Sequence, residues 1–447
     1  MLREARSAVT WSLNYGLPRA MFKKAARRGD LMSRLELEPA LLEDPFPTYE
    51  EFRARGRLVL GTVMPVTVDH AISTAVLRSP DFGVAAGQAG LPHRIRRVLE
   101  AASDPWSAGP VDPPSMLVTD PPDHTRYRRL VSRAFTVRTI EGLEPMIQAT
   151  ADQLLDRVES SDSFDVVEQF AALLPVAVIA RMLGVPDHMH RQLLEWGNGA
   201  AVTLDPALTW RRYRKADRDV RNLHAWFAEH IRSVRREPRD DLISRLANLE
   251  GDDRLTDIEL RATGLLLLGA GFETTVNLIG NAVRVLDQHP DQLRRLQDDP
   301  SGWGNAVEEV LRYDSPVQLT LRQAYVDTEV DGVPVPEGQP VLTYLGGANR
   351  DPAVFADPQT FDVTRSDAGD HLAFSSGIHY CLGAGLARLE ATVALRTLYE
   401  RRPDLRLSGP PVRRDTRVLR GYEHLPVSSD PERKERRSHE VAQRGPA

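Results

Sequence analysis

The sequence predicts a mainly α-helical fold with a minor β region, organised around one very long central helix. Three observations predict this fold class. Helical periodicity dominates the middle of the chain. Thr256 and Glu259 form a capping-box pattern before an apolar run that keeps helical spacing to Gln288, about 48 Å at 1.5 Å per residue. A short region of strand signals follows. A helix of this length can only run through the middle of a large body.

Residues 1–40 indicate a basic amphipathic N-terminal extension. Asn14, Gly16 and Pro18 interrupt its apolar residues, so it lacks the contiguous apolar core of a signal peptide. We expect a solvated helix packed on the body, with weak contact between residues 1–30 and a membrane surface as the alternative. The residues that carry this pattern are Arg3, Arg6, Trp11, Leu13, Leu17, Arg19, Met21, Phe22, Lys23, Lys24, Arg27 and Arg28.

The segment from Ser79 to Asp123 predicts a long irregular connection, because it holds three proline-containing breaks. Connections of this length are usually functional or disordered. After it, periodicity predicts four helices before the central one. They are expected over residues 124–135, 139–160, 166–183 and 216–235, with a glycine-marked end at Gly184.

The central helix is expected to stop at His289-Pro290. Beyond it, residues 330–333 predict a β-hairpin around Asp331-Gly332, and residues 341–345 predict a buried strand. Many helices and a minor sheet favour a single domain over residues 41–429. Residues 430–447 are polar and charged, which predicts a disordered tail.

The composition is that of a globular protein, with 447 residues, 41% of them hydrophobic and 27% charged. A net charge of -6 argues against a nucleic-acid partner, which favours strongly basic chains. No stretch reaches the roughly 18 apolar residues of a membrane span, so we expect no transmembrane segment. The single cysteine excludes an intramolecular disulfide and favours the reducing cytoplasm.

That cysteine, Cys381, lies in the segment Phe374-Ser375-Ser376-Gly377-Ile378-His379-Tyr380-Cys381-Leu382-Gly383. A lone cysteine is most often a small buried hydrophobe, and it can also be a protease nucleophile. Here a thiolate with glycines on both sides could instead cradle a haem iron. A thiolate ligand pushes electron density to the iron and favours O–O cleavage.

The spacing of this segment resembles the cysteine loop of the cytochrome P450 haem–thiolate monooxygenases. The loop in that family runs Phe, two residues, Gly, one residue, His, one residue, Cys, one residue, Gly, and this chain matches every fixed position. It departs at Ser375, where the family usually has Gly, which leaves the bend of the loop open. The resemblance covers roughly residues 44–427. It implies the family's triangular helical fold, haem b bound in contact with Phe374 and Gly383, and Cys381 as the metal ligand.

The central helix interrupts its apolar sequence with Gly271, Glu273, Thr274 and Thr275. Mid-helix threonine can bond back to the carbonyl four residues earlier, and glycine leaves room beside the axis. From the residues alone, a face turned locally to solvent is the alternative. With the cysteine loop present, the segment resembles the family's acid–alcohol pair. The resemblance implies that Thr274 holds a water for dioxygen and that Glu273 relays protons to it.

Four cationic or N–H donor side chains match the family's contacts to the haem propionates. They are His124 and Arg128 on one helix, Arg322 in an apolar strand, and His379 before the cysteine. Glu309 and Arg312 resemble the family's Glu-x-x-Arg pair, which Arg365 would complete. The role implied for these three residues is to brace the cysteine loop.

Arg126, Arg129 and Arg133 share a second face of the early helix. Such a stripe is usually solvated, but beside a haem on an acidic protein it suggests a docking surface for an acidic electron donor. We expect no flavin or iron–sulfur domain in the chain. The resemblance therefore implies an external ferredoxin and ferredoxin reductase, with NAD(P)H as the indirect electron source.

The function predicted is insertion of one oxygen atom from O2 into a small apolar organic substrate, by hydroxylation or epoxidation. A peroxygenase and a haem-dependent sensor or carrier are the alternatives. The acid–alcohol pair argues against a peroxygenase, which would not need it. Apolar side chains at the expected contact regions favour an apolar pocket. Those regions are residues 91–116, 193–213, 266–270, 317–320 and 421–422.

Overall fold

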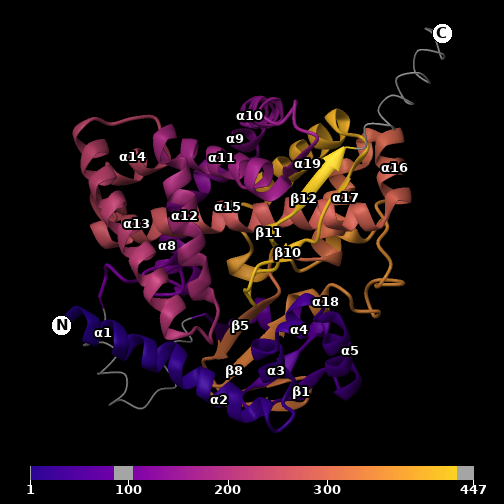
Figure 1. Cartoon of the computed structure of the whole chain (residues 1–447). Helices are drawn as coiled ribbons and strands as arrows, with labels where there is room; N and C mark the ends of the chain where they lie inside the picture. Colours follow the sequence, from indigo (N-terminus) through magenta and orange to yellow (C-terminus); the bar gives the residue numbers. More distant parts are fainter. Residues whose placement is uncertain (1, 85–103, 430–447) are drawn as a thin grey trace.

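The computed structural model describes residues 2–84 and 104–429, and the expected tail at 430–447 lies outside this range. Its N-terminal part is a continuous helical rod of α1 (Leu2–Trp11), a π-helical turn (Ser12–Gly16) and α2 (Leu17–Ala26). The shorter helices α3 (Leu31–Leu37), α4 (Pro39–Glu43) and α5 (Phe46–Arg55) follow. The rod lies along one edge of the molecule (Figure 1).

Aromatic side chains attach this rod to the body. The indole N–H of Trp11 donates to the carbonyl of Leu208 at 3.0 Å, and the Trp11 ring lies 5.5 Å from that of Trp210. Tyr15 packs 5.4 Å from Tyr213. The aromatic face of the extension therefore contacts protein. The membrane contact predicted for residues 1–30 would have to use the opposite, exposed side chains, such as Leu17 and Met21.

The principal sheet has five strands in the order β1-β2-β8-β5-β3. These are β1 (Leu58–Leu60), β2 (Pro65–Thr67), β3 (Phe82–Gly83), β5 (Leu319–Ala324) and β8 (Pro340–Tyr344), with α6 (His70–Arg78) between β2 and β3. The predicted hairpin is confirmed as β6 (Thr328–Val330) and β7 (Val333–Val335). Asp331 and Gly332 both have positive φ at its turn, as a tight hairpin requires. The predicted buried strand at 341–345 is β8.

The helical body is formed by α8 (Asp123–Ser132), α9 (Val137–Glu141), α10 (Glu144–Asp156), α11 (Leu173–Leu183), α12 (His190–Ala201), α13 (Trp210–Arg236), α14 (Leu242–Ala247), α16 (Pro290–Asp298), α17 (Trp303–Tyr313), α18 (Leu345–Ala348) and α19 (Ala384–Arg401). The single helix predicted over 139–160 is wrong, because the chain turns at Gly142 and Leu143 and forms α9 and α10 instead. The helix predicted over 166–183 begins with a π-helical turn, Val167–Ala171.

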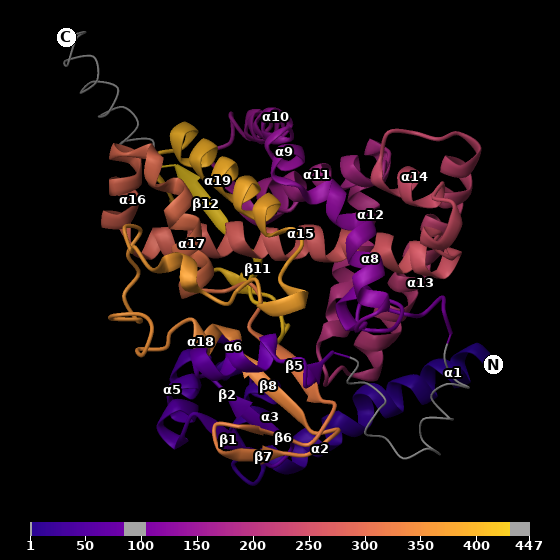
Figure 2. The ribbon, with the colours of Figure 1, turned by 180° about the vertical axis from the view of Figure 1, so that it is seen from behind.

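The predicted central helix is confirmed as α15 (Asp257–Gln288), with the Thr256–Glu259 capping box formed. It crosses the whole molecule between the other helices (Figure 2). By length and composition α15 could span a bilayer, but 78% of its apolar window is buried inside the protein. It is therefore packed as a core helix, and α11, α12, α13 and α19 all contact it.

Two small β units complete the described chain. The first is a sheet in the order β4 (Ser163–Asp165), β12 (Pro426–Ser429), β9 (Leu405–Leu407). The second is the hairpin of β10 (Val412–Arg413) and β11 (Tyr422–His424), with β11 in contact with α15. This hairpin places the predicted contact residues 421–422 against the central helix.

Candidate active site

The cysteine loop is a tight structure formed by residues 374–383. The Cys381 N–H donates to the Phe374 carbonyl at 2.9 Å, and residues 377–379 form a 3₁₀ turn. Gly377 has a φ of 71°, and a Cβ there would lie 2.4 Å from the Leu77 carbonyl oxygen, so this position requires glycine. Burial raises the pKa of the Cys381 thiol. A thiolate at this position needs a cation beside it, and a metal ion supplies one.

Ser375 marks the departure from the family pattern, and it has a φ of 62°. Its N–H donates to the Leu372 carbonyl at 2.8 Å, so the loop keeps its bend without glycine. A non-glycine residue in this region costs roughly 1–2 kcal/mol. The serine therefore adopts the conformation that glycine would favour.

The middle of α15 contains a short accessible stretch between two buried parts of the helix. Residues 260–268 and most of residues 272–286 are buried, yet Ala270 is exposed and Gly269, Gly271 and Thr274 are partly exposed. A Cβ on Gly269 would meet nothing within 4 Å. The Thr274 hydroxyl donates to the Ala270 carbonyl at 2.9 Å, as expected for a mid-helix threonine. A flat cofactor or a substrate could fit against this stretch.

Glu273 and Thr274 are adjacent but face different partners. Glu273 is 3% exposed, and its Oε1 lies 3.0 Å from the Arg414 guanidinium, next to β10. Burial raises the pKa of Glu273, and the charge of Arg414 opposes that rise. Its Oε2 has no hydrogen-bond partner in the described part of the chain. Sequence reasoning missed Arg414, because 141 residues separate it from Glu273 and no local pattern joins them.

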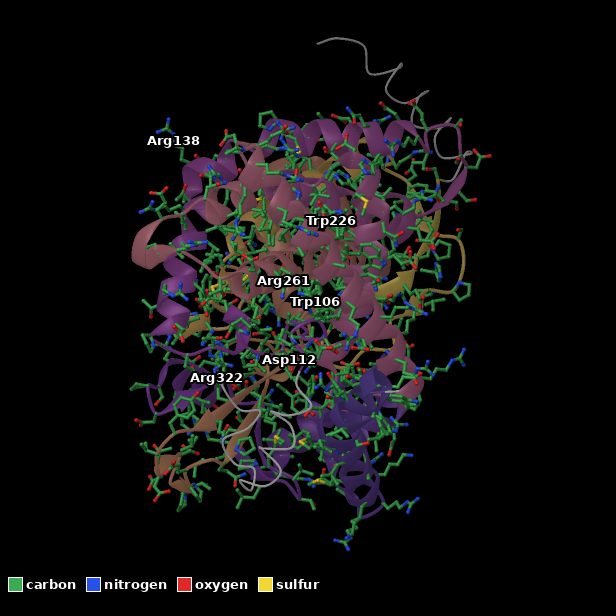
Figure 3. The ribbon with its side chains drawn as sticks, turned by 90° about the vertical axis from the view of Figure 1, so that its left-hand side faces the viewer. Trp106, Asp112, Arg138, Trp226, Arg261 and Arg322 are labelled. Atoms are coloured by element: carbon green, nitrogen blue, oxygen red, sulfur yellow. The ribbon has the colours of Figure 1, made fainter. Side chains whose placement is uncertain are left out.

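Three of the four predicted propionate ligands gather in one buried group. The rings of His124 and His379 are 4.2 Å apart, and both Nε2 atoms lack a hydrogen-bond partner among the described residues. Arg322 is 5% exposed on β5, where Figure 3 labels it. Burial, and then the proximity of His124 and Arg322, lower the pKa of His379 to about 4. Burial lowers the pKa of Arg322 to about 10.

This group fits an anionic ligand. Within the described residues, the acidic side chain that pairs with it is Asp120, 3.8 Å from His379 Nε2. Arg128 lies one turn after His124 and donates to the Tyr380 carbonyl at 2.7 Å, so it contacts the cysteine loop itself. Two carboxylates entering the group would pair with the Arg322 guanidinium and accept hydrogen bonds from the imidazole N–H groups. The residues present therefore fit a haem whose propionates point toward His124, Arg322 and His379.

Comparison with known proteins agrees with this geometry. The cytochrome P450 family model matches residues 104–300 and 304–401. Cytochrome P450 140 of Mycobacterium tuberculosis (strain ATCC 25618 / H37Rv) is 46% identical over 433 residues, which is 96% of this chain and 99% of that protein. The chain belongs to the cytochrome P450 family. Family members are haem monooxygenases, so this chain is an oxidoreductase of that class.

Two further relatives of this cytochrome P450 carry informative names. The 6-deoxyerythronolide B hydroxylase of Saccharopolyspora erythraea is 44% identical over 321 residues, covering 71% of this chain and 78% of that protein. A solved structure of P450BioI, in complex with an acyl carrier protein that carries hexadec-9Z-enoic acid, superposes with a TM-score of 0.79. It is 37% identical and covers 88% of this chain and all of that one. The cytochrome P450 fold is thereby confirmed.

The Glu-x-x-Arg pair of this cytochrome P450 is formed and completely buried. Arg312 makes two bonds to Glu309, at 2.6 and 2.8 Å, and Arg365 reaches Glu309 at 3.3 Å. Arg312 also donates to the carbonyls of Asn349, Pro358 and Thr360. The predicted contact among the three residues is therefore confirmed, and it fastens the segment that leads into the cysteine loop.

Two of the three arginines of the basic stripe predicted in this cytochrome P450 form ion pairs within the chain. Arg126 forms an ion pair with Glu259, and Arg129 pairs with Asp253 at 2.5 Å. Arg133 is exposed. Sequence periodicity placed these side chains on one helix face but could not show that Asp253, just before α15, and Glu259, in its first turn, would pack against that face.

The expected substrate regions of this cytochrome P450 are described in part, since residues 85–103 lie outside the described range. In the rest of the first region, Trp106 stacks 4.5 Å from the guanidinium of Arg261 on α15, and Figure 3 labels both. Leu319, Thr320 and Leu321 of β5 are partly exposed, whereas Leu266 and Leu267 are buried.

The expected region 193–213 includes the loop before α13. Hydrogen bonds and ring contacts from Trp11 and Tyr15 join this loop and the start of α13 to the N-terminal rod.

Proposed function

We propose that this cytochrome P450 binds haem b and uses O2 to insert one oxygen atom into an apolar organic substrate. Haem, when bound, supplies the activation of dioxygen. Cys381 would be its thiolate ligand, Phe374 and Gly383 would pack beside it, and the buried group of His124, Arg322 and His379, with Arg128 next to it, would hold the propionates. The observation that carries this proposal is that cluster of imidazole and guanidinium N–H donors, formed beside a cysteine loop of the family type.

The chain's own acid and alcohol would manage protons. The Thr274 hydroxyl borders the accessible stretch of α15 and could hold a water there. Glu273 Oε2 would pass protons toward that water. Burial raises the pKa of Glu273 and Arg414 opposes that rise, and a carboxyl whose pKa is raised by burial can act as a general acid. This pair favours a monooxygenase over the peroxygenase and the sensor.

Electrons would come from a ferredoxin and its reductase, with NAD(P)H as the source, in the cytoplasm. The docking surface that we propose is the exposed side of the cysteine loop, where Ile378 is 54% and Tyr380 40% exposed. Three arginines from different helices contact this loop. Arg78 donates to the Ser376 hydroxyl at 2.7 Å and Arg128 to the Tyr380 carbonyl. Arg388 donates to the Tyr380 hydroxyl at 3.3 Å and also pairs with Glu308, so Arg78 and Arg128 supply most of the positive charge of this rim. An apolar centre with a basic rim suits an acidic partner.

The substrate class that we propose is a long acyl chain or a polyketide-like molecule. It is supported by the names of two solved relatives, P450BioI in complex with an acyl carrier protein that carries hexadec-9Z-enoic acid and the cytochrome P450 PksS of a bacillaene polyketide synthase. Apolar side chains at residues 317–320 are consistent with such a ligand.

The test is a spectral titration of the purified holoenzyme with free fatty acids, acyl carrier protein loaded with an acyl chain, and macrolides. We expect a ligand of this class to displace water from the iron in a saturable way. The same ligand should then stimulate NAD(P)H consumption and yield an oxygenated product. Binding without turnover in the presence of ferredoxin and reductase would favour the sensor or carrier instead.

A further inference from the structure

Three buried polar side chains form a file along one face of α15. Glu273, Asn277 and Asn281 are spaced four residues apart and are 3%, 1% and 0% exposed. The residues around them are apolar core. Side chains at i, i+4 and i+8 follow one another along a helix face. The file begins at the proposed proton-relaying acid and runs toward the C-terminal end of the helix.

Each member of the file keeps a polar atom that no described protein group satisfies. These atoms are Oε2 of Glu273, both Oδ1 and Nδ2 of Asn277, and Oδ1 of Asn281. A buried polar atom without a partner costs roughly 1–3 kcal/mol, and proteins usually satisfy such atoms with ordered water. Four of these atoms on one helix face indicate a hydrated strip.

The hairpin of β10 and β11 covers this strip. A Cβ on Gly421 would lie 2.0 Å from Asn277 Oδ1, so only glycine lets the hairpin approach the amide this closely. Arg414 comes from the same hairpin to Glu273. At the far end, Asn281 Nδ2 donates to the carbonyls of Asp314 and Arg420 at 2.9 and 3.1 Å.

Beyond Asn281, charged groups continue the file to the surface. Arg413 lies 3.7 Å from Asp314 and 3.7 Å from Glu43, and the Glu43 side chain is 66% exposed. The Nη1 of Arg413 is another buried atom without a partner in the described chain. The unsatisfied polar atoms therefore extend from Glu273 to a residue that faces solvent.

We propose that Asn277 and Asn281 hold a file of ordered waters that carries protons from the surface at Glu43 to Oε2 of Glu273. Successive members are about 6 Å apart along the helix, a distance that one water with two hydrogen bonds of about 2.8 Å can bridge. Each water accepts a proton on one side and releases one on the other, and the carboxylate oxygen of Glu273 takes up the last. The amides orient the waters and do not change protonation state.

This inference rests on the proposed proton role of Glu273, so the experiment must distinguish a failure of the water file from a failure of that role. The holoenzyme variants are Asn277→Leu, Asn281→Leu, Asn277→Ser and Glu273→Gln. Asn248→Leu is the control, because its amide also donates to two carbonyls, as that of Asn281 does, but it caps the C-terminal end of α14 and is not a member of the file. Haem content, the substrate-induced spectral shift and the rate of reduction by the donor are measured first, to establish that the fold and the docking are intact.

The two leucine variants should then lower the product formed per NAD(P)H by on the order of tenfold. This loss is smaller than the roughly hundredfold or more that a positioned acid contributes, because Glu273 itself is still present in both variants. They should also enlarge the solvent deuterium isotope effect on product formation, a change that a purely structural role would not produce. Asn277→Ser should restore most of the activity, because a hydroxyl can still hold water. Asn248→Leu should behave as wild type.

Normal coupling and a normal isotope effect in both leucine variants, with Glu273→Gln impaired, would overturn the water file and leave the role of Glu273 standing. A normal Glu273→Gln enzyme would overturn both. A high-resolution crystal structure of the wild-type enzyme tests the same point if the leucine variants fail to fold. Ordered waters bonded to Asn277 and Asn281 support the file, and a dry, closed contact between α15 and the hairpin overturns it.

Discussion

At the residue scale, the chemistry of this protein depends on a few side chains whose surroundings set their charge. Burial raises the pKa of the Cys381 thiol, and burial together with the proximity of His124 and Arg322 lowers that of His379 to about 4. Both effects indicate a site arranged for a charged ligand: a metal ion for the thiolate, and carboxylates for the N–H donors of His124, Arg322 and His379.

Replacing Cys381 with alanine should abolish the reduced carbon-monoxide band that thiolate ligation produces. The physical reason is that the chain has no second cysteine to take its place. Cys381→His is the companion variant, and it should retain haem with a globin-like spectrum. A thiolate-type spectrum in the alanine variant would show that the ligand assignment is wrong.

Replacing Thr274 with alanine should leave substrate binding intact and divert reducing equivalents into peroxide. The hydroxyl that would hold the water is lost, while the helix keeps its backbone bonds. Product formed per NAD(P)H consumed is the quantity to measure. Thr275→Val is the control on the adjacent, buried position, and an unchanged ratio in Thr274→Ala would contradict the proposed role.

At the element scale, the active site is assembled by contacts between segments that are distant in sequence. The hairpin brings Arg414 to α15, α6 and α19 bring Arg78 and Arg388 to the cysteine loop, and α3 brings Glu36 toward the loop before α13. The position of each element therefore sets the charge state or the accessibility of a side chain on a neighbouring element.

Charge reversal at Arg78 should slow reduction by ferredoxin without weakening substrate binding. Surface charges at an interface act mainly on the association rate, and salt should reduce the effect. Stopped-flow reduction at low and high ionic strength measures it. Arg129→Glu is the matched control, because Arg129 is already paired with Asp253 and lies outside the proposed surface. Equal rates for Arg78→Glu and wild type at low salt would contradict the docking surface.

Glu36 should make stability depend on pH. Burial and the nearby charge of Asp205 raise its pKa to about 8, from 4.5 in the unfolded chain. Between these two values the folded protein holds a proton that the unfolded chain releases, so stability should fall as the pH rises from about 4.5 to about 8. Denaturant titrations across this range should show a smaller fall for Glu36→Gln. An identical slope in the variant and the wild type would show that Glu36 does not titrate in this way.

At the scale of the whole molecule, α15 is the axis of one large hydrophobic core, and the N-terminal rod is fastened to its edge. The rod contributes Tyr15 to a small apolar cluster with Leu208 and Tyr213, and Trp11 packs against that cluster. This contact joins the chain start to the loop before α13, which is one of the expected substrate regions.

Removing residues 2–26 should lower the melting temperature and loosen the loop before α13. The loss includes the Trp11–Trp210 and Tyr15–Tyr213 contacts, and aromatic pairs contribute about 0.5–1.5 kcal/mol each beyond their burial. Calorimetry and hydrogen exchange of residues 202–209 measure the two effects. The milder Trp11→Ala variant should show a smaller change in the same direction. Unaltered exchange in both would mean that the rod does not restrain the loop.

The sequence by itself determined the features that are encoded locally. The capping box and the continuous apolar pattern specify α15, Asp331-Gly332 specifies the β6–β7 turn, and the spacing around Cys381 indicates the family. The four expected propionate ligands were also named from sequence, although their role in binding haem stays a prediction. Local signals suffice here because capping, turn formation and loop spacing involve residues within a few positions of one another.

Only the tertiary structure decided which groups meet across long separations. It paired Glu273 with Arg414, neutralised Arg126 and Arg129 with Glu259 and Asp253, and turned the aromatic face of the extension toward the body. It also lined up Asn277 and Asn281 beneath the β10–β11 hairpin. The physical reason is that burial and charge pairing are properties of packed surfaces. A helical pattern shows which side chains share a face, and the packing of the other elements determines what that face contacts.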